Sequence, residues 1–308
     1  MKTRKTVLLT ADWNYFPMAM FTAWIVDQNH PQRDFDICLA SIDTLPDHPL
    51  IQKLGVRVLR LEPPDVTAPT THRIPATAYL RLSAPEALKH DYDRILYMDC
   101  DMLHIRGDLS RLMQVDLGPH ALAAVRDDAQ LRNHRRVPRD FRALGIGFHK
   151  YLNSGFLLID TADFCARGIG RQALELAVAR SEAMIYHDQS ALNAVLKGDW
   201  AELPLVWNFQ FCQKTLYFAV HFRPAILHFI TSQKPWKSRY GIYPGWILDL
   251  YRGFFQTHFP VQYAAMQDLP ASDARPGIQR LLLLIHAISA RKYLANLTRF
   301  SDEWDVRY

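Results

Sequence analysis

Arg94-Ile-Leu-Tyr-Met-Asp-Cys-Asp-Met-Leu103 is an apolar run that ends in two closely spaced carboxylates. Side chains alternate between the two faces of a strand, so Asp99 and Asp101 are expected to project to the same side. Ligands of open α/β sheets bind beyond the carboxyl ends of the strands. Two carboxylates there repel each other unless a cation joins them, and oxygen ligands favour Mg²⁺ or Mn²⁺. The stretch predicts a divalent-metal site at a sheet edge, and the alternative is a pair of solvated carboxylates that caps a turn.

The flanking segments alternate between strand and helix patterns. Residues 6–10 form an apolar run that leads into the polar stretch 11–14, which is typical of a buried parallel strand that opens into a loop. Helices are expected at residues 16–28 and 79–88, and further strands at residues 35–40, 56–61, 122–125, 156–159, 200–203 and 226–230, with strand ends within 208–213. This alternation predicts an α/β fold with a mixed central sheet.

Composition excludes several classes of protein. The chain has 308 residues, of which 49% are hydrophobic and 22% are charged, so it can bury a full core. No repeat of solenoid or propeller type is present. The four cysteines lack CxxC spacing, which argues against a disulfide framework or a structural zinc site and favours a reducing compartment. The N-terminal apolar run is too short for a signal peptide, and no stretch reaches the roughly 20 apolar residues of a membrane span, so a cytoplasmic protein is expected.

Basic residues cluster in two segments. A formal net charge of +5 leaves room for an anionic partner without choosing among nucleic acid, lipid and phosphorylated substrate. Residues 126–150 carry seven Arg and Lys against three Asp, which predicts a long basic loop. Residues 277–301 contain no acidic residue and place Arg and Lys between apolar positions at helical spacing. They predict one or two basic amphipathic helices, which either pack on the core or dock on an anionic membrane surface.

Other polar patterns accompany the predicted strands. His228 ends an apolar run and Lys234 follows in a polar turn, so a metal ligand and a phosphate-binding cation would lie together, although a histidine at a strand end is also typical of a satisfied core residue. Residues 153–155 (Asn-Ser-Gly) predict a tight turn before a strand, and Asp188 predicts the N-cap of a helix over 190–196. The chain has no GxGxxG, P-loop or GxSxG motif, which argues against nicotinamide dehydrogenases, P-loop NTPases and α/β-hydrolases.

Taken in order, these stretches resemble glycosyltransferase family eight, the retaining, metal-dependent transferases that include bacterial lipopolysaccharide galactosyl- and glucosyltransferases. The matching stretches lie within residues 6 to about 240: residues 10–15 (TADWNY), 79–82 (YLRL), 96–101 (LYMDCD), 152–156 (LNSGF), 187–189 (HDQ), 203–208 (LPLVWN) and 228–236. The resemblance implies a GT-A architecture with a Rossmann-like nucleotide-binding half at roughly 1–105 and an acceptor half at 106–245. Residues 246–308 would then be a helical, basic C-terminal segment that associates with membranes.

The resemblance also implies roles for individual residues. Mn²⁺, or Mg²⁺, would be held by Asp99, Asp101 and His228. The catalytic pair would be Asp188 and Gln189. The donor nucleotide and its sugar would contact Ala11, Asp12, Asn14, Tyr15, Arg81, Asp127, Asn153 and Lys234. In one departure, Thr231 occupies a turn after the metal histidine where the family often has glycine.

The predicted function is transfer of glucose or galactose from a UDP-sugar, with retention, to a saccharide or glycolipid acceptor such as a lipopolysaccharide core. No nucleic-acid partner is expected, and the enzyme would be peripheral on the cytoplasmic face of the membrane. A haloacid-dehalogenase-like phosphatase also uses an apolar strand that ends in Asp-x-Asp, and an inactive nucleotide-sugar-binding protein would keep the same fold. Both are alternatives.

Overall fold

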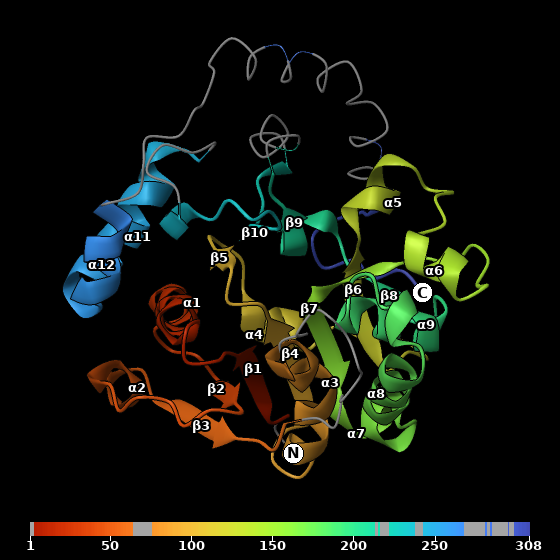
Figure 1. Cartoon of the computed structure of the whole chain (residues 1–308), viewed down its shortest axis with the longest axis horizontal. Helices are drawn as coiled ribbons and strands as arrows, with labels where there is room; N and C mark the ends of the chain where they lie inside the picture. The colour runs from red at the N-terminus through yellow and green to blue at the C-terminus, as the bar shows by residue number, and fades with distance from the viewer. Residues whose placement is uncertain are drawn as a thin grey trace.

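The computed structural model describes residues 3–63, 76–212, 215, 222–237, 243–267, 281, 284, 295 and 299–308 (Figure 1). The strands are β1 (Lys5–Thr10), β2 (Asp36–Ser41), β3 (Val56–Arg60), β4 (Arg94–Met98), β5 (Met102–His104), β6 (Leu122–Arg126), β7 (Leu152–Asp160), β8 (Ala201–Glu202), β9 (Phe209–Gln210) and β10 (Ile226–His228). The helices are α1 (Phe16–Asn29), α2 (Pro49–Lys53), α3 (Ala76–Leu88), α4 (Leu109–Leu112), α5 (Asp128–Arg132), α6 (Arg139–Ala143), α7 (Thr161–Ala166), α8 (Ile169–Ala179), α9 (Asp188–Leu196), α11 (Gly245–His258) and α12 (Pro260–Gln267). Single 3₁₀ turns are η1 (Ser181–Ala183), η2 (Leu205–Asn208) and η3 (Pro235–Lys237).

Seven strands form the central sheet in the order β3-β2-β1-β4-β7-β6-β8. Strands β1 to β4 run parallel, β7 is antiparallel to both β4 and β6, and β8 is parallel to β6. The predicted α/β fold and the predicted mixed sheet are therefore confirmed. The apolar runs of β1 and β4 follow from this position, because central strands of such a sheet are covered on both faces.

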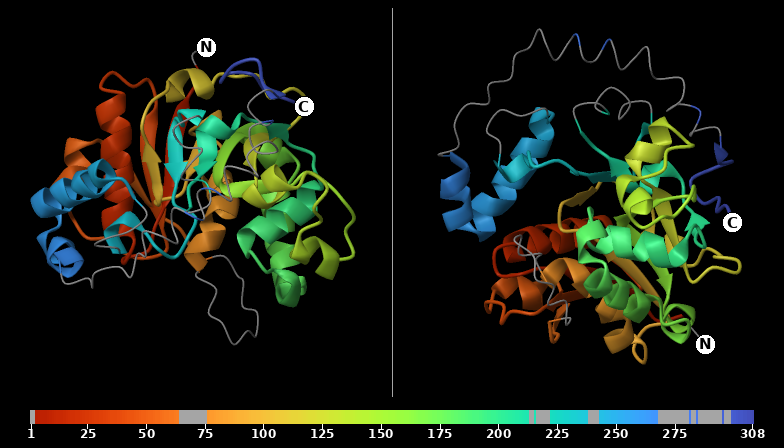
Figure 2. Two further views of the ribbon diagram at one scale, coloured as in Figure 1. Left: turned by 90° about the horizontal axis from the view of Figure 1, so that it is seen from above. Right: turned by 45° about the vertical axis from the view of Figure 1, so that its right-hand side comes forward.

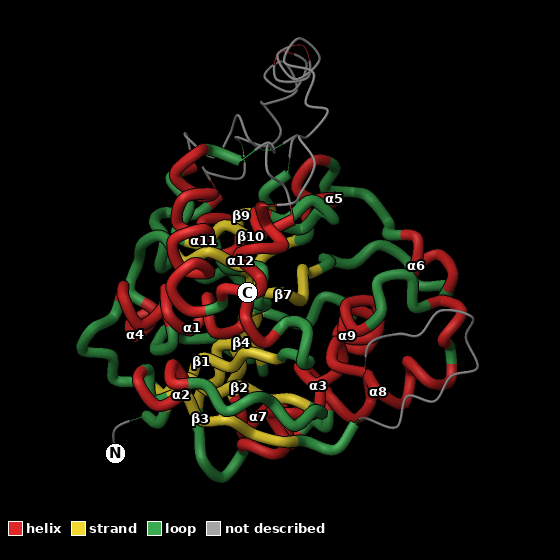
Figure 3. The backbone as a smooth tube through the Cα atoms, turned by 60° about the vertical axis from the view of Figure 1, so that its left-hand side comes forward, coloured by secondary structure: helices red, strands yellow, loops and turns green. Residues whose placement is uncertain are grey.

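Helices cover both faces of the sheet and create two cores. On β1, Leu8 packs into the core under α3, α8 and α9, whereas its neighbours Val7 and Leu9 pack into the core under α1 and α11. Figure 3 shows α8 and α9 side by side on one side of the strands, with α1 and α11 on the other. Burial of each aliphatic side chain contributes roughly 1.5–3 kcal/mol to the stability of the fold. Packing on both faces of the sheet therefore fixes the position of the carboxyl ends of the strands.

A small second sheet stands at the edge where β4 ends. It has the order β5-β10-β9, with β10 antiparallel to β5 and parallel to β9. His228 pairs with Met102 and Ile226 with His104 across the β5–β10 ladder. The chain between β4 and β5 is only the turn that carries the two carboxylates, so the ladder places them beside a strand more than 120 residues later in the chain.

Three local predictions are wrong. Residues 153–155 do not form a turn, because β7 already begins at Leu152 and runs through them. Asp188 is not the N-cap of α9, since it is the first helical residue and its carboxylate bonds to other side chains. Residues 126–150 are not one long loop, because they contain the end of β6 and the helices α5 and α6.

Where the structure describes it, the C-terminal part of the chain packs against the rest of the fold. Helices α11 and α12, in blue in Figure 2, lie beside α1, and the ring of Tyr251 stacks on Phe21 with 3.9 Å between centroids. Further on, Arg299 forms ion pairs with the buried Glu202 of β8, which also pairs with Arg126. No helix in the described ranges is long and apolar enough to cross a membrane.

The predicted amphipathic helices at 277–301 lie almost entirely outside the described residues. The division of the chain at residue 245 also stays a prediction.

Candidate metal and donor site

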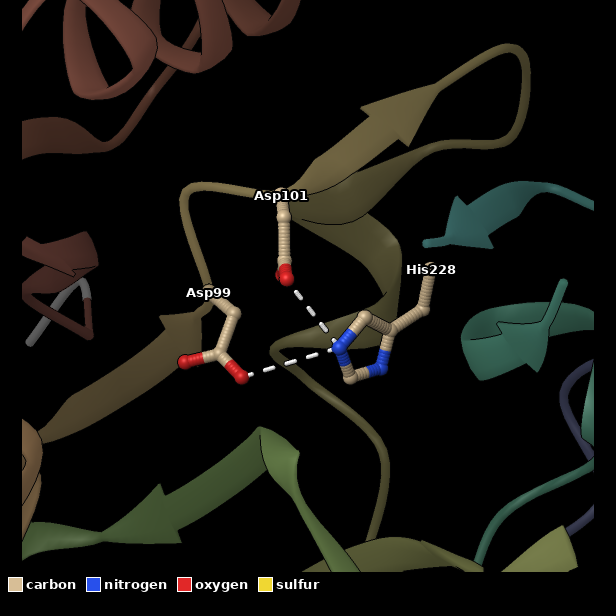
Figure 4. Close-up of side chains that lie close together, drawn as sticks. All are labelled: Asp99, Asp101 and His228. Carbon is tan, nitrogen blue, oxygen red and sulfur yellow. Dashed lines mark ion pairs between the residues drawn. The ribbon is translucent and has the colours of Figure 1, made fainter. Parts of the chain in front are cut away.

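Two carboxylates and one imidazole converge at the end of β4, as Figure 4 shows. The Nε2 atom of His228 lies 3.3 Å from Oδ1 of Asp101 and 3.7 Å from Oδ2 of Asp99. One ligand atom from each residue lies within 4.8 Å of the other two. Two carboxylates and an imidazole suit a hard or borderline divalent cation, and the nitrogen ligand favours Mn²⁺ over Mg²⁺.

Backbone hydrogen bonds hold the two carboxylates in this geometry. Asp99 lies just beyond β4, and its backbone N–H donates to the carbonyl of Gly155 on β7 at 2.9 Å. The carbonyl of Asp101 accepts from the backbone N–H of Phe229 at 3.0 Å, directly after β10. The convergence therefore comes from a turn clamped between two other strands, rather than from strand alternation alone.

Gly155 leaves the space that the site occupies. A Cβ atom there would lie 2.5 Å from Cε1 of His228 and 2.6 Å from Oδ2 of Asp99, closer than side chains can approach. In addition, Oδ1 of Asp101 is buried and has no hydrogen-bond partner among the described residues. The close approach of His228 and Asp99 that Gly155 allows, and a buried carboxylate oxygen that accepts no hydrogen bond, both fit a bound cation.

The charges around Asp101 keep it ionised. Burial disfavours the charged carboxylate, but the neighbouring His228 and Lys234 outweigh this effect and hold the pKa of Asp101 well below its usual range. The Nζ atom of Lys234 lies 2.6 Å from Oδ2 of Asp101. The structure thus places the predicted phosphate-binding lysine at the predicted metal site.

Arg81 joins the metal carboxylates to the predicted catalytic pair. Its guanidinium lies 3.0 Å from Oδ1 of Asp99 and 3.1 Å from Oδ2 of Asp188, and it also donates to the carbonyl of Ser154 at 2.9 Å. Burial opposes the charge of Arg81, yet Asp188 and Asp99 outweigh it and raise the pKa of Arg81 further. These protein groups therefore occupy the guanidinium of Arg81.

Amide groups continue this network on the other side. Oε1 of Gln189 accepts from the backbone N–H of Ser154 at 3.1 Å and from Nδ2 of Asn153 at 3.3 Å. Nε2 of Gln189 donates to Oδ2 of Asp127 at 3.3 Å. Burial raises the pKa values of Asp127 and Asp188. Asn153, Asp127, Asp188 and Gln189 are therefore brought together, as predicted.

The predicted nucleotide loop lies at the end of β1. Asp12 caps it by accepting from the backbone N–H of Tyr15 at 2.8 Å, while Ala11 is buried and Asn14 is exposed. Burial of its hydroxyl group, followed by the charge of Asp101, raises the pKa of Tyr15. No hydrogen bond or ion pair among the described residues joins Ala11, Asp12 or Asn14 to the three predicted metal ligands.

Sequence reasoning missed the roles of three residues around the cluster. The hydroxyl of Tyr97 donates to Oδ1 of Asp99 at 2.7 Å. Gly155 has no Cβ atom and so lets His228 and Asp99 pack closely against it, and Oδ1 of Asn208 lies 3.0 Å from Nδ1 of His228. All three lie inside the stretches that carry the family resemblance. The motifs therefore mark these positions, but they do not show what each residue contacts. A separate cavity of about 1010 Å³ lies between α3, α7 and α8, and no predicted site residue lines it.

Comparison with known proteins decides the family. Residues 6–239 match the family described as glycosyl transferase family 8. The chain belongs to this family. It is 32% identical over 180 residues to general stress protein A of Bacillus subtilis, covering 54% of this chain and 60% of that protein. It is 30% identical over 177 residues to the lipopolysaccharide 1,2-glucosyltransferase of Escherichia coli, covering 54% of this chain and 50% of that protein.

Solved structures support the fold. The galactosyltransferase LgtC, crystallised with donor and acceptor sugar analogues, superposes with a TM-score of 0.68 at 24% identity, covering 85% of this chain and 99% of that one. At this identity the likeness shows the GT-A fold. The family membership also argues against the phosphatase alternative.

Proposed function

We propose that this chain is a retaining, metal-dependent hexosyltransferase that moves glucose or galactose from a UDP-sugar to a saccharide or glycolipid acceptor. The observation that carries the proposal is the convergence of Asp99, Asp101 and His228, two of which pack closely against Gly155. The E. coli relative is named as a lipopolysaccharide glucosyltransferase, which supports a lipopolysaccharide core as the acceptor.

Different residues of the site would assist the departure of UDP in different ways. A divalent cation bound by the three ligands would act as a Lewis acid on the diphosphate, and such charge stabilisation is worth several kcal/mol. Lys234 supplies a second positive charge beside it, on the turn that follows β10. Asp188, which forms an ion pair with Arg81, is placed to accept hydrogen bonds from sugar hydroxyls and so to orient the donor.

The hydrogen bonds of Gln189 favour one retaining route over another. A double displacement needs a free nucleophile at the anomeric carbon. Oε1 of Gln189 already accepts two hydrogen bonds, from Ser154 and Asn153, so it is a poor nucleophile. We therefore favour attack on the same face: the bond from carbon to phosphate oxygen breaks, the acceptor oxygen bonds to that carbon, and the acceptor proton passes to the leaving phosphate oxygen.

A turnover assay tests the function. The full chain would be incubated with Mn²⁺, UDP-glucose or UDP-galactose and a core oligosaccharide, with UDP release and the anomeric configuration of the product as readouts. The proposal predicts UDP release and a retained configuration. Release of phosphate from a monoester would instead mark a phosphatase, and nucleotide binding without turnover would mark an inactive binder.

The role assignment has its own test. Asp188→Asn and Gln189→Ala should each lower the transfer rate by about 10²-fold, since each removes one positioned polar group at the reacting sugar. The matched control Asp249→Asn changes an exposed carboxylate on α11 and should leave the rate unchanged. Full transfer rates in both site variants would remove the assignment.

The membrane role of the C-terminal segment is part of the proposal. Deleting the segment would also remove Arg299 from the buried Glu202, so substitution is the cleaner test. Arg291→Gln with Lys292→Gln should weaken binding to vesicles that contain phosphatidylglycerol by about 30-fold, because each surface cation contributes ~1 kcal/mol. The control pair Arg171→Gln with Arg180→Gln makes the same charge change at exposed residues of α8 and its C-cap, outside this segment. Equal vesicle binding by both pairs would contradict the role.

A further inference from the structure

A buried amide contacts the imidazole of the candidate metal ligand on the side away from the carboxylates. Asn208 ends the turn η2 and is completely buried. Its Oδ1 atom lies 3.0 Å from Nδ1 of His228, and its Nδ2 atom lies 2.9 Å from Oδ1 of Asn153. The side chain therefore bridges Asn153 and His228, and no hydrogen bond among the described residues joins it to Asp99 or Asp101.

Backbone groups determine which way each amide points. The backbone N–H of Gly155 can only donate, and it bonds to Oδ1 of Asn153 at 3.2 Å, so that atom is an oxygen. The atom of Asn208 that faces this oxygen must then be its nitrogen, and the atom that faces His228 must be its oxygen. An amide oxygen only accepts hydrogen bonds, so Nδ1 of His228 must carry a proton.

We propose that Asn208 is a positioning residue that holds the proton of His228 on Nδ1 and so presents the lone pair of Nε2 to the metal. The inference rests on the proposed metal-dependent function. Histidine ligands of metals commonly donate their second N–H to such a partner, which fixes both tautomer and ring orientation. Without Asn208 the proton could move to Nε2, which faces Asp101 at 3.3 Å, and His228 would form an ordinary hydrogen bond in place of a metal bond.

The same chain contains a matched control. Asn29 also contacts a histidine, with its Nδ2 atom 3.2 Å from Nδ1 of His104, but this pair lies at the other end of the β5–β10 ladder. No carboxylate forms an ion pair with His104 among the described residues. A change at Asn29 therefore removes an asparagine–histidine hydrogen bond, here donated by the amide nitrogen, without touching the site.

The first test reads the proton directly and needs no turnover. Long-range ¹H–¹⁵N spectra of the full chain labelled at histidine would be recorded without metal at mildly alkaline pH. The variant His228→Gln identifies the signal by its loss. A protonated Nδ1 with an unprotonated Nε2 is expected in the wild-type protein, and a proton on Nε2 would overturn the inference.

The second test measures binding of Mn²⁺ alone, by the electron paramagnetic resonance signal of the free ion. Asn208→Leu should weaken binding by about 10–100-fold, the usual effect of losing such a partner. Asn208→Asp keeps an acceptor for Nδ1 and should retain binding to within about tenfold. The control Asn29→Leu should bind as the wild type does.

The outcomes separate this inference from the proposed function. A folded Asn208→Leu protein that binds Mn²⁺ as tightly as the wild type would overturn the role of Asn208. If that variant does not fold, the spectra and the Asn208→Asp protein decide. A wild-type protein with Nδ1 protonated but no affinity for Mn²⁺ would support the tautomer assignment and contradict the metal-dependent function.

Discussion

Two histidines at opposite ends of one two-strand ladder show how the same residue type becomes a core group or a candidate ligand. His104 and His228 lie on β5 and β10, and each contacts one asparagine. At His104 the amide nitrogen of Asn29 donates both to the His104 carbonyl and toward Nδ1, so Nδ1 accepts and Nε2 donates to the carbonyl of Gly107 at 3.2 Å. Both ring nitrogens of His104 are satisfied by protein groups.

At His228 the direction of the asparagine–histidine hydrogen bond is reversed. The oxygen of Asn208 faces Nδ1, and Nε2 faces the carboxylates of Asp99 and Asp101. The difference teaches that burial and strand position do not distinguish a metal ligand from a core histidine. The orientation of the neighbouring amide does, because it decides which nitrogen keeps a free lone pair.

The largest expected effect comes from making one substitution at both histidines. His228→Leu should lower UDP-sugar turnover by at least about 10³-fold, because loss of a ligand removes several kcal/mol of charge stabilisation. His104→Leu should leave turnover near the wild-type value and lower the free energy of unfolding by about 1–3 kcal/mol, since it leaves the buried partners of His104 unpaired. Turnover and chemical denaturation measure the two quantities. Equal losses of turnover in the two variants would contradict the assignment of His228 as a ligand and His104 as a core residue.

A smaller effect is expected from adding a Cβ atom at Gly155, beside His228. Gly155→Ala places a Cβ atom against His228 and Asp99, and the central strand β7 cannot move away, so the affinity for Mn²⁺ should fall by about 10²-fold. Gly253→Ala on α11 meets no atom within 4 Å and should stabilise the protein by about 0.5–1 kcal/mol through helix propensity. Calorimetric titration with Mn²⁺ checks the first value. Unchanged affinity in the Gly155 variant would mean that the ion binds elsewhere.

The smallest effect concerns acid stability at the core histidine. Burial, with a contribution from the adjacent His30, lowers the pKa of His104 to about 3, below its value in the unfolded chain. The unfolded state then binds the extra proton as the pH falls below about 6.5, so the stabilisation is present above that pH and declines toward pH 3, by up to about 1.4 kcal/mol per pH unit. Urea unfolding of the wild type and of His104→Leu between about pH 7 and pH 5 isolates this slope. Parallel curves would show that His104 titrates normally.

The sequence predicts the elements that depend on local pattern. The apolar run before Asp99 becomes β4, and the alternation around it becomes the mixed sheet, because burial on both faces demands continuous apolar strands. Asp99 and Asp101 were recognisable from their spacing at a strand end. His228 was recognisable only together with its family context, since a histidine at a strand end is usually a core residue.

The remaining features depend on pairings that no local pattern contains. Gly155 was expected in a turn, yet its missing Cβ matters because β7 runs antiparallel beside β4. The role of Asn208 depends on the distant strand that brings His228 to it. The anchoring of Arg299 on Glu202 also joins segments almost a hundred residues apart in the chain.

Crystals grown with Mn²⁺ and UDP, measured at the manganese absorption edge, test the central claim most directly. The account predicts one anomalous peak bonded to Asp99, Asp101 and Nε2 of His228, with the diphosphate between that peak and Lys234. Nucleotide bound elsewhere, with no manganese between the carboxylates and the imidazole, would contradict it.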